Sequence, residues 1–114
     1  MFFKRFKTSQ PSFMPGRDQL LDRAHAAVRL RELDVAESFI LENGAAIWQD
    51  AACLNVLGLI AEARGDWRKA RRLWTRAARA NKCYQPAWQN LRRYFELFQF
   101  GRSASPVAFG DDAA

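Results

Sequence analysis

The 114-residue sequence has few of the residues that form catalytic or metal sites, and few that break helices. It contains one histidine (His25), two cysteines (Cys53 and Cys83), six glycines and four prolines. The cysteines form no CxxC or Cys/His spacing, so they predict neither a disulfide framework nor a zinc site, and we expect reduced thiols. Every glycine and proline except Gly58 lies near an end or between periodic stretches, which favours helices over a turn-rich β fold.

The sequence also lacks the groupings on which enzyme mechanisms depend. It shows no paired carboxylates, no glycine-rich phosphate loop and no metal-ligand spacing, and neither cysteine has a histidine partner nearby in the sequence. On an alanine-rich helix, His25 is more often a groove or structural residue than a base. We therefore expect no catalysis, no cofactor and no metal, although a site completed by another subunit stays open.

No apolar run reaches the length that crosses a bilayer. The first 16 residues, MFFKRFKTSQPSFMPG, mix cations with aromatics and have no continuous apolar core or small-residue cleavage site, so they do not resemble a secretory signal. We expect a cytoplasmic protein. FFKRFK could instead lie on an anionic membrane surface, a reading that we rank low because the segment is short and unpatterned.

Apolar residues recur at helical spacing in five stretches, and nothing in the sequence predicts a strand. The first helix is expected from Arg17 to Arg31, the second around residues 35–40, and the third from Asp50 to Arg64. The fourth opens at Asp66, and the fifth follows NKCYQP and ends near Gly101. The prediction is an all-α domain over residues 17–100, with an N-terminal arm (1–16) and a C-terminal tail (101–114).

Residues of similar role recur 34 positions apart. Examples are Ala36 and Ala70, Leu54 and Trp88, and Leu57 and Leu91. The middle unit reads Leu54-x2-Leu57-Gly58-x2-Ala61, then Gly65-Asp66, then Ala70-x3-Trp74-x2-Ala77. This pattern resembles the tetratricopeptide repeat (TPR) family, with two repeats and one closing helix. The first unit departs from the pattern at Arg23 and Ile40, and an unrelated five-helix bundle is the alternative.

The resemblance implies that the first helix of each pair lines a concave groove and the second lies outside. Gly58 would then allow close helix approach, with Trp67, Trp74, Trp88 and Leu57 holding the scaffold. The expected groove residues are His25, Arg29, Asn55, Leu59, Glu62, Gln89 and Arg93. Asn and Arg suit hydrogen bonding to an extended peptide. The carboxylate-binding set of some family members is not reproduced, because Leu21 stands at the leading lysine position.

Positive charge is concentrated in one part of the chain. Residues 64–93 hold ten Lys/Arg and one acid, a net charge of +9, whereas the rest has eight basic and eleven acidic residues, a net charge of −3. We name the exposed cations of the fourth helix the basic stripe: Arg68, Lys69, Arg71, Arg72, Arg76 and Arg79. The stripe is either a solvated face or an anion-binding surface, and we rank an acidic protein above nucleic acid or anionic lipid. No aromatic side chain is expected on this face, which lowers the nucleic-acid option.

The fifth helix carries apolar residues on more than one side. Its end-helix face comprises Tyr94, Leu97, Phe98 and Phe100, and something should cover it. The arms (Phe2, Phe3, Phe6, Phe13, Phe109), a second subunit or another protein could do so. We therefore expect a non-catalytic protein–protein interaction module, an adaptor or accessory subunit. The alternative is a nucleic-acid or membrane-surface binder.

Overall fold

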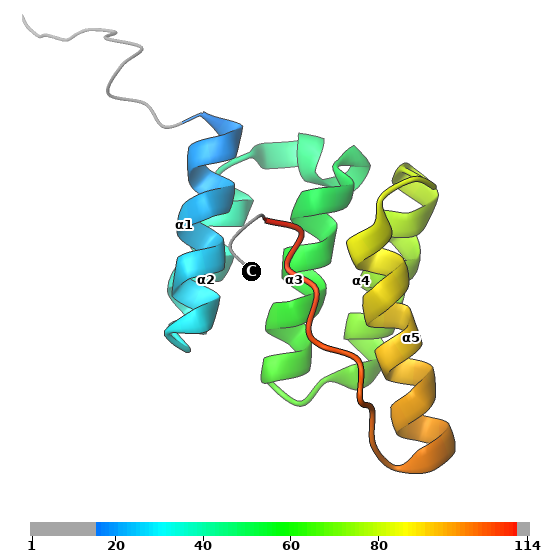
Figure 1. The fold of residues 1–114 in the computed structure, drawn as a ribbon. Helices are drawn as coiled ribbons and strands as arrows, with labels where there is room; N and C mark the ends of the chain where they lie inside the picture. The colour runs from blue at the N-terminus through cyan, green and yellow to red at the C-terminus, as the bar shows by residue number, and fades with distance from the viewer. Residues whose placement is uncertain (1–15, 112–114) are drawn as a thin grey trace, which may run out of the picture.

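The computed structural model describes residues 16–111, and within them every regular element is helical (Figure 1). The five α-helices are α1 (Arg17–Arg29), α2 (Leu33–Leu41), α3 (Ala51–Ala63), α4 (Trp67–Ala80) and α5 (Gln85–Phe100), and a 3-10 helix, η3 (Gly44–Gln49), precedes α3. The all-α prediction is confirmed. No helix in this part of the chain combines the length and apolarity needed to span a membrane.

The helix boundaries follow from local capping chemistry. The Asp50 carboxylate accepts hydrogen bonds from the backbone N–H groups of Ala52 and Cys53 at the start of α3, and Asp66 accepts one from Lys69 at the start of α4. Gly101 ends α5 with φ of 75°, a left-handed conformation that glycine adopts without steric cost. These three signals were present in the sequence.

The helices pack as consecutive antiparallel pairs, with α1 beside α2 and α3 beside α4, and α5 closes the array (Figure 1). Helix α3 is central: it contacts α1, α2, α4, α5 and η3, and its residues 51–61 are all buried. The α3–α4 pair makes the most extensive contact in the molecule. An arrangement of this kind lets each hairpin bury its apolar face against the next one.

The close approach of α3 and α4 depends on Gly58. A Cβ atom at this position would lie 2.3 Å from Nε1 of Trp74, well inside van der Waals contact. Trp74 is fully buried and its indole N–H donates a hydrogen bond to the carbonyl of Asn55 at 3.2 Å. The indole ring therefore occupies the space that the missing side chain leaves free, and the close helix approach expected at Gly58 is present.

Trp88 does not hold the scaffold, and that expectation is wrong. Its side chain is 47% exposed, and its indole N–H donates to the carbonyl of Lys82 at 2.9 Å. In α5 the buried positions are instead Ala87, Asn90, Leu91 and Arg93. The physical reason is that no further helix follows α5 in the described chain, so the side of the helix that carries Trp88 has no neighbour to pack against.

The described part of the C-terminal tail, residues 101–111, has no helix or strand but follows a defined path. After Gly101 it turns back along α5 and crosses α3 toward α1 (Figure 1). The hydroxyl groups of Ser103 and Ser105 donate to the Glu96 carboxylate at 2.6 and 3.0 Å, and hold the start of the tail against α5. The segment expected to be irregular is therefore fixed on the helical domain.

Candidate functional site

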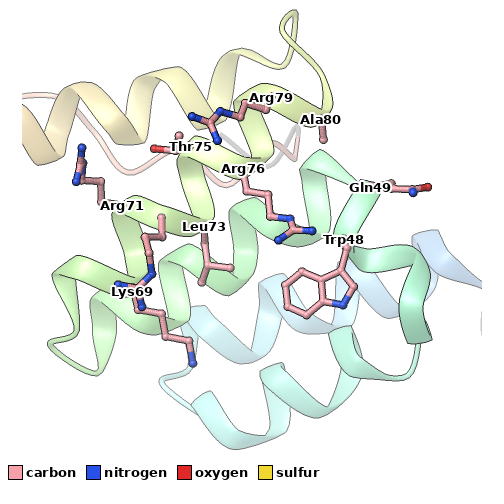
Figure 2. Close-up of a pocket in the computed structure, with 10 residues that line it drawn as sticks. Trp48, Gln49, Lys69, Arg71, Leu73, Thr75, Arg76, Arg79 and Ala80 are labelled. Atoms are coloured by element: carbon pink, nitrogen blue, oxygen red, sulfur yellow. The ribbon is translucent and has the colours of Figure 1, made fainter.

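A hollow of about 880 Å³ opens between η3 and α4 (Figure 2). Ten residues line it, among them the apolar Leu73, and half of the ten are cationic. Five of the six residues of the basic stripe line it, namely Lys69, Arg71, Arg72, Arg76 and Arg79. Arg68 lies outside the lining. We name this feature the basic hollow.

The stripe cations have no acidic partners within residues 16–111. Salt bridges in that range join Arg17 to Asp18 and Asp50, Arg29 to Asp111, Arg64 to Asp34 and Glu37, and Arg93 to Glu62. None of these pairs involves α4. The positive charge of the basic hollow is therefore not cancelled by neighbouring carboxylates in the described chain, and an anion entering it would meet an uncompensated field.

Trp48 forms one wall of the basic hollow, which sequence reasoning missed. Its side chain is 46% exposed, and the Arg76 guanidinium carbon lies 4.9 Å from the ring centroid, in the range of a cation–π contact (Figure 2). The expectation that no aromatic side chain lies on the basic face is wrong. Trp48 comes from η3, beside the buried Ile47, and an element this short has no periodicity to reveal where its side chains point.

The end-helix face is continuous with the basic stripe. The Arg71 guanidinium carbon lies 5.9 Å from the centroid of the Tyr94 ring, and Tyr94 in turn lies 4.5 Å from Phe98 and 6.3 Å from Trp67, centroid to centroid. Tyr94 and Leu97 are half-buried, whereas Phe98 and Phe100 are exposed. The helical domain thus presents cations and aromatic rings side by side.

The expected groove residues lie on α1, α3 and α5, and the C-terminal tail contacts four of them, His25, Arg29, Asn55 and Gln89. Asn55 and Asn90 are fully buried, and the Asn90 amide donates to Asn55 Oδ1 at 2.8 Å. Both amides also donate to the carbonyl of Ala108, at 3.0 and 2.8 Å, and the Ala108 N–H donates to Asn90 Oδ1 at 3.1 Å. Gln89 donates to the carbonyl of Pro106 at 2.7 Å. The groove therefore holds an extended backbone.

Arg93 lies beneath this network and is almost completely buried. Its guanidinium donates to both carboxylate oxygens of Glu62, and also to Asn90 Oδ1 at 3.1 Å. A buried arginine is tolerated when its donors are satisfied in this way. Arg93 therefore positions the Asn90 amide rather than facing a ligand directly.

Phe109 and Asp111 fasten the tail to α1. The Arg29 guanidinium carbon lies 3.9 Å from the Phe109 ring centroid, and Arg29 donates two hydrogen bonds to the Asp111 carboxylate, at 2.7 and 3.0 Å. This contact lowers the pKa of Asp111 and raises that of Arg29. His25 lies edge-to-face with Phe109 at 5.8 Å. Phe109 therefore covers α1, not the end-helix face. The other proposed covers, Phe2, Phe3, Phe6 and Phe13, lie outside the described residues.

Burial suppresses the ionisation of one thiol and one phenol in the described chain. Cys53 is buried, and burial raises the pKa of its thiol to about 12, so the nucleophilic thiolate is suppressed. Burial likewise raises the pKa of Tyr84 to about 12. Cys83 is exposed.

Comparisons of this chain with protein-family models, with curated proteins and with solved structures found no match. The TPR resemblance therefore remains a prediction from the sequence pattern described above.

Proposed function

We propose that this chain is a non-catalytic protein–protein interaction module, an adaptor or accessory subunit that binds an acidic segment of a partner in the basic hollow. The observation that carries the proposal is the set of five cations on α4 that line one concavity and have no acidic partner in the described chain. Ordinary solvated helix faces mix both signs of charge.

The apolar part of the basic hollow supports a protein ligand. Leu73 and Trp48 give it a floor and a wall that an apolar side chain can contact, while Arg72 and Arg76 suit bidentate binding of carboxylates. An acidic segment with one apolar residue matches both features. The neighbouring end-helix face extends this surface, because Arg71 and Tyr94 are in contact.

Single-stranded nucleic acid is the second candidate, and Trp48 favours it specifically. Nucleic-acid grooves combine cations along the backbone with aromatic rings on which bases stack. Trp48 gives the basic hollow one such ring, already approached by Arg76. Successive bases need more than one platform, and among residues 16–111 Trp48 is the only aromatic residue that lines this hollow.

The test is charge reversal with a matched control. Arg72→Glu with Arg76→Glu should abolish capture of the native partner from host extract, whereas Arg23→Glu with Arg92→Glu, equal in net charge but on α1 and α5, should leave it intact. The salt dependence identifies the ligand class. Bound nucleic acid whose log binding constant falls linearly with the logarithm of the salt concentration indicates the second candidate. Unchanged binding by the α4 double variant would disprove both.

A further inference from the structure

A second, smaller concavity adjoins the basic hollow on the side of α2. Its volume is about 360 Å³, and it is more enclosed than the basic hollow. Six of its ten lining residues are apolar: Leu41, Trp48, Leu57, Ile60, Ala61 and Leu73. We name it the apolar pocket. Trp48, Lys69 and Leu73 line both concavities (Figure 2), so one bound segment can contact the two at once.

The apolar pocket reaches the hydrophobic core. Its lining residues from α3, Leu57, Ile60 and Ala61, are each less than a tenth exposed. Leu41 and Trp48, from α2 and η3, are instead 53% and 46% exposed. The buried residues therefore form the bottom of the pocket and the exposed ones its mouth. A side chain that enters exchanges water for apolar contacts on several sides.

The two concavities differ in charge. Among residues 16–111, five cations and no acid line the basic hollow, whereas the apolar pocket has two of each: Arg64 and Lys69 with Glu37 and Asp66. Arg64 is already paired with Glu37 at 3.3 Å. Asp66 accepts the hydrogen bond from the Lys69 N–H that caps α4. An acidic side chain is thus attracted to the basic hollow but meets two carboxylates in the apolar pocket, which favours an uncharged apolar group there.

The apolar pocket lies at one end of the basic hollow. The two concavities meet at Lys69 and Leu73 of α4. From there the apolar pocket continues to Asp66, just before the helix, and the basic hollow continues to Ala80 at its end. A ligand that matches this surface therefore has an apolar group at one end and carboxylates along the rest.

The chain's own ends do not match this surface. The described part of the tail is held by Asn55, Asn90 and Arg29, none of which lines either concavity. Residues 1–15 carry three cations and no acid, so the basic hollow repels them. Charge complementarity therefore points to an acidic segment of another protein.

We propose that the apolar pocket and the basic hollow together bind an acidic segment of a partner protein that bears one leucine-sized apolar side chain at its end, seated in the apolar pocket. This inference rests on the proposed function and adds a chemical feature to the partner of the basic hollow. The carboxylates of the segment supply the long-range attraction. The apolar end distinguishes this segment from other acidic chains, so the apolar pocket determines specificity.

The experiment uses the full-length chain and three capped nonapeptides, LEEEEEEEE, EEEEEEEEL and EEEELEEEE, each with a control peptide in which serine replaces leucine. In calorimetric titrations at low salt, at least one peptide with a terminal leucine should bind about tenfold more tightly than its serine control, as expected for burial of one leucine side chain. The central leucine should give a smaller gain, because half of the glutamates then extend away from the basic hollow.

The outcomes separate this inference from the proposed function. If the leucine and serine peptides bind equally well and Arg72→Glu with Arg76→Glu abolishes their binding, the apolar pocket is rejected and the basic hollow stands. If none of the peptides binds the wild type, both fail.

A charge placed at the mouth of the apolar pocket tests where the leucine binds. Leu41→Asp alters this pocket alone, whereas Leu30→Asp adds the same charge at an exposed site that lines neither concavity. Leu41→Asp should bring the affinity ratio of leucine to serine peptide close to one, and Leu30→Asp should preserve the gain. Circular dichroism checks the fold, and Leu41→Ser replaces Leu41→Asp if helicity is lost. A leucine gain that persists in the folded variant rejects the pocket. Wild-type dimers that dissociate in Leu41→Asp would assign it to a second copy and overturn the partner assignment.

Discussion

The side-chain amides of Asn55 and Asn90, 35 residues apart, are hydrogen-bonded to each other at 2.8 Å and both hold the carbonyl of Ala108. This pair joins α3 to α5 and both helices to the tail. A buried amide stabilises a structure only when its partners are present, since each polar atom left without one carries a desolvation cost.

Asn90→Ala should therefore destabilise the protein by about 2–3 kcal/mol, because Asn55 and Ala108 lose partners that water cannot replace. Denaturant unfolding measures the loss, and amide hydrogen exchange at Ala108 should accelerate. Gln85→Ala, at an exposed position of the same helix, is the control. Equal stability of the two variants would show that the network is dispensable.

Gly58→Ala should destabilise the domain by about 1–3 kcal/mol, because the added methyl group overlaps the Trp74 indole. Alanine is the better helix former, so this result would run against helix propensity by roughly 1 kcal/mol. Gly16→Ala has open space around its Cβ position and serves as the control in the same unfolding measurement. A neutral Gly58→Ala would contradict the close α3–α4 packing.

Asp50→Ala should cost about 1–2 kcal/mol, since it removes the cap of α3 together with the hydrogen bonds from Arg17 at 2.7 and 2.8 Å. Those bonds lower the pKa of Asp50 to about 2. A carboxyl group whose pKa is lowered in the folded state stabilises that state. The contribution is fully present above the pKa of the unfolded chain, near 4, and is lost as the pH falls toward 2. Unfolding measured from pH 5 to pH 2 should show a shallower decline in Asp50→Asn. If the wild type and Asp50→Asn lose the same stability between pH 5 and pH 2, the Arg17–Asp50 pair is not the source of the acid sensitivity.

Stability should also fall between pH 7 and pH 5, through His25. Burial lowers the pKa of the imidazole, while Asp111 and Asp22 oppose that shift and Arg29 reinforces it. A histidine with a lowered pKa in the folded state stabilises that state above pH 6.5, and this contribution is lost as the pH falls and the unfolded or undocked form takes up the proton. His25→Phe should flatten this slope while keeping the edge-to-face contact with Phe109. If stability depends on pH in the same way in the wild type and in His25→Phe, His25 is not the source of this slope.

The helices and their ends were predictable because their determinants are local. Asp50, Asp66 and Gly101 act within a few residues of their own positions. The sequence predicted a close helix approach at Gly58, but not that the Trp74 ring fills the space there. Such signals survive in a single sequence because few other conformations satisfy them.

Two features of the candidate sites depend on the fold and left no periodic signal. Trp48 lies in a six-residue 3-10 helix, and the described part of the tail, residues 101–111, has no helix or strand. The pairing of Arg29 with Asp111 joins residues 82 positions apart, and many acids could have served as well. The wrong prediction for Trp88 has a different cause. Periodicity showed that α5 has an apolar side, but it could not show whether another helix covers the side that carries Trp88.

The Arg29–Asp111 pair changes how the ends of the molecule depend on each other. Helices α1 and α5 have no Cα atoms within 8 Å of each other. In a simple stack of hairpins, these two terminal helices would therefore unfold independently. The tail runs from α5 to α1 and closes the stack into a ring of contacts. Fraying of α1 then frees the tail, and release of the tail uncovers α5. We therefore expect the two edges of the protein to melt as a single cooperative unit, with the middle hairpin enclosed between them.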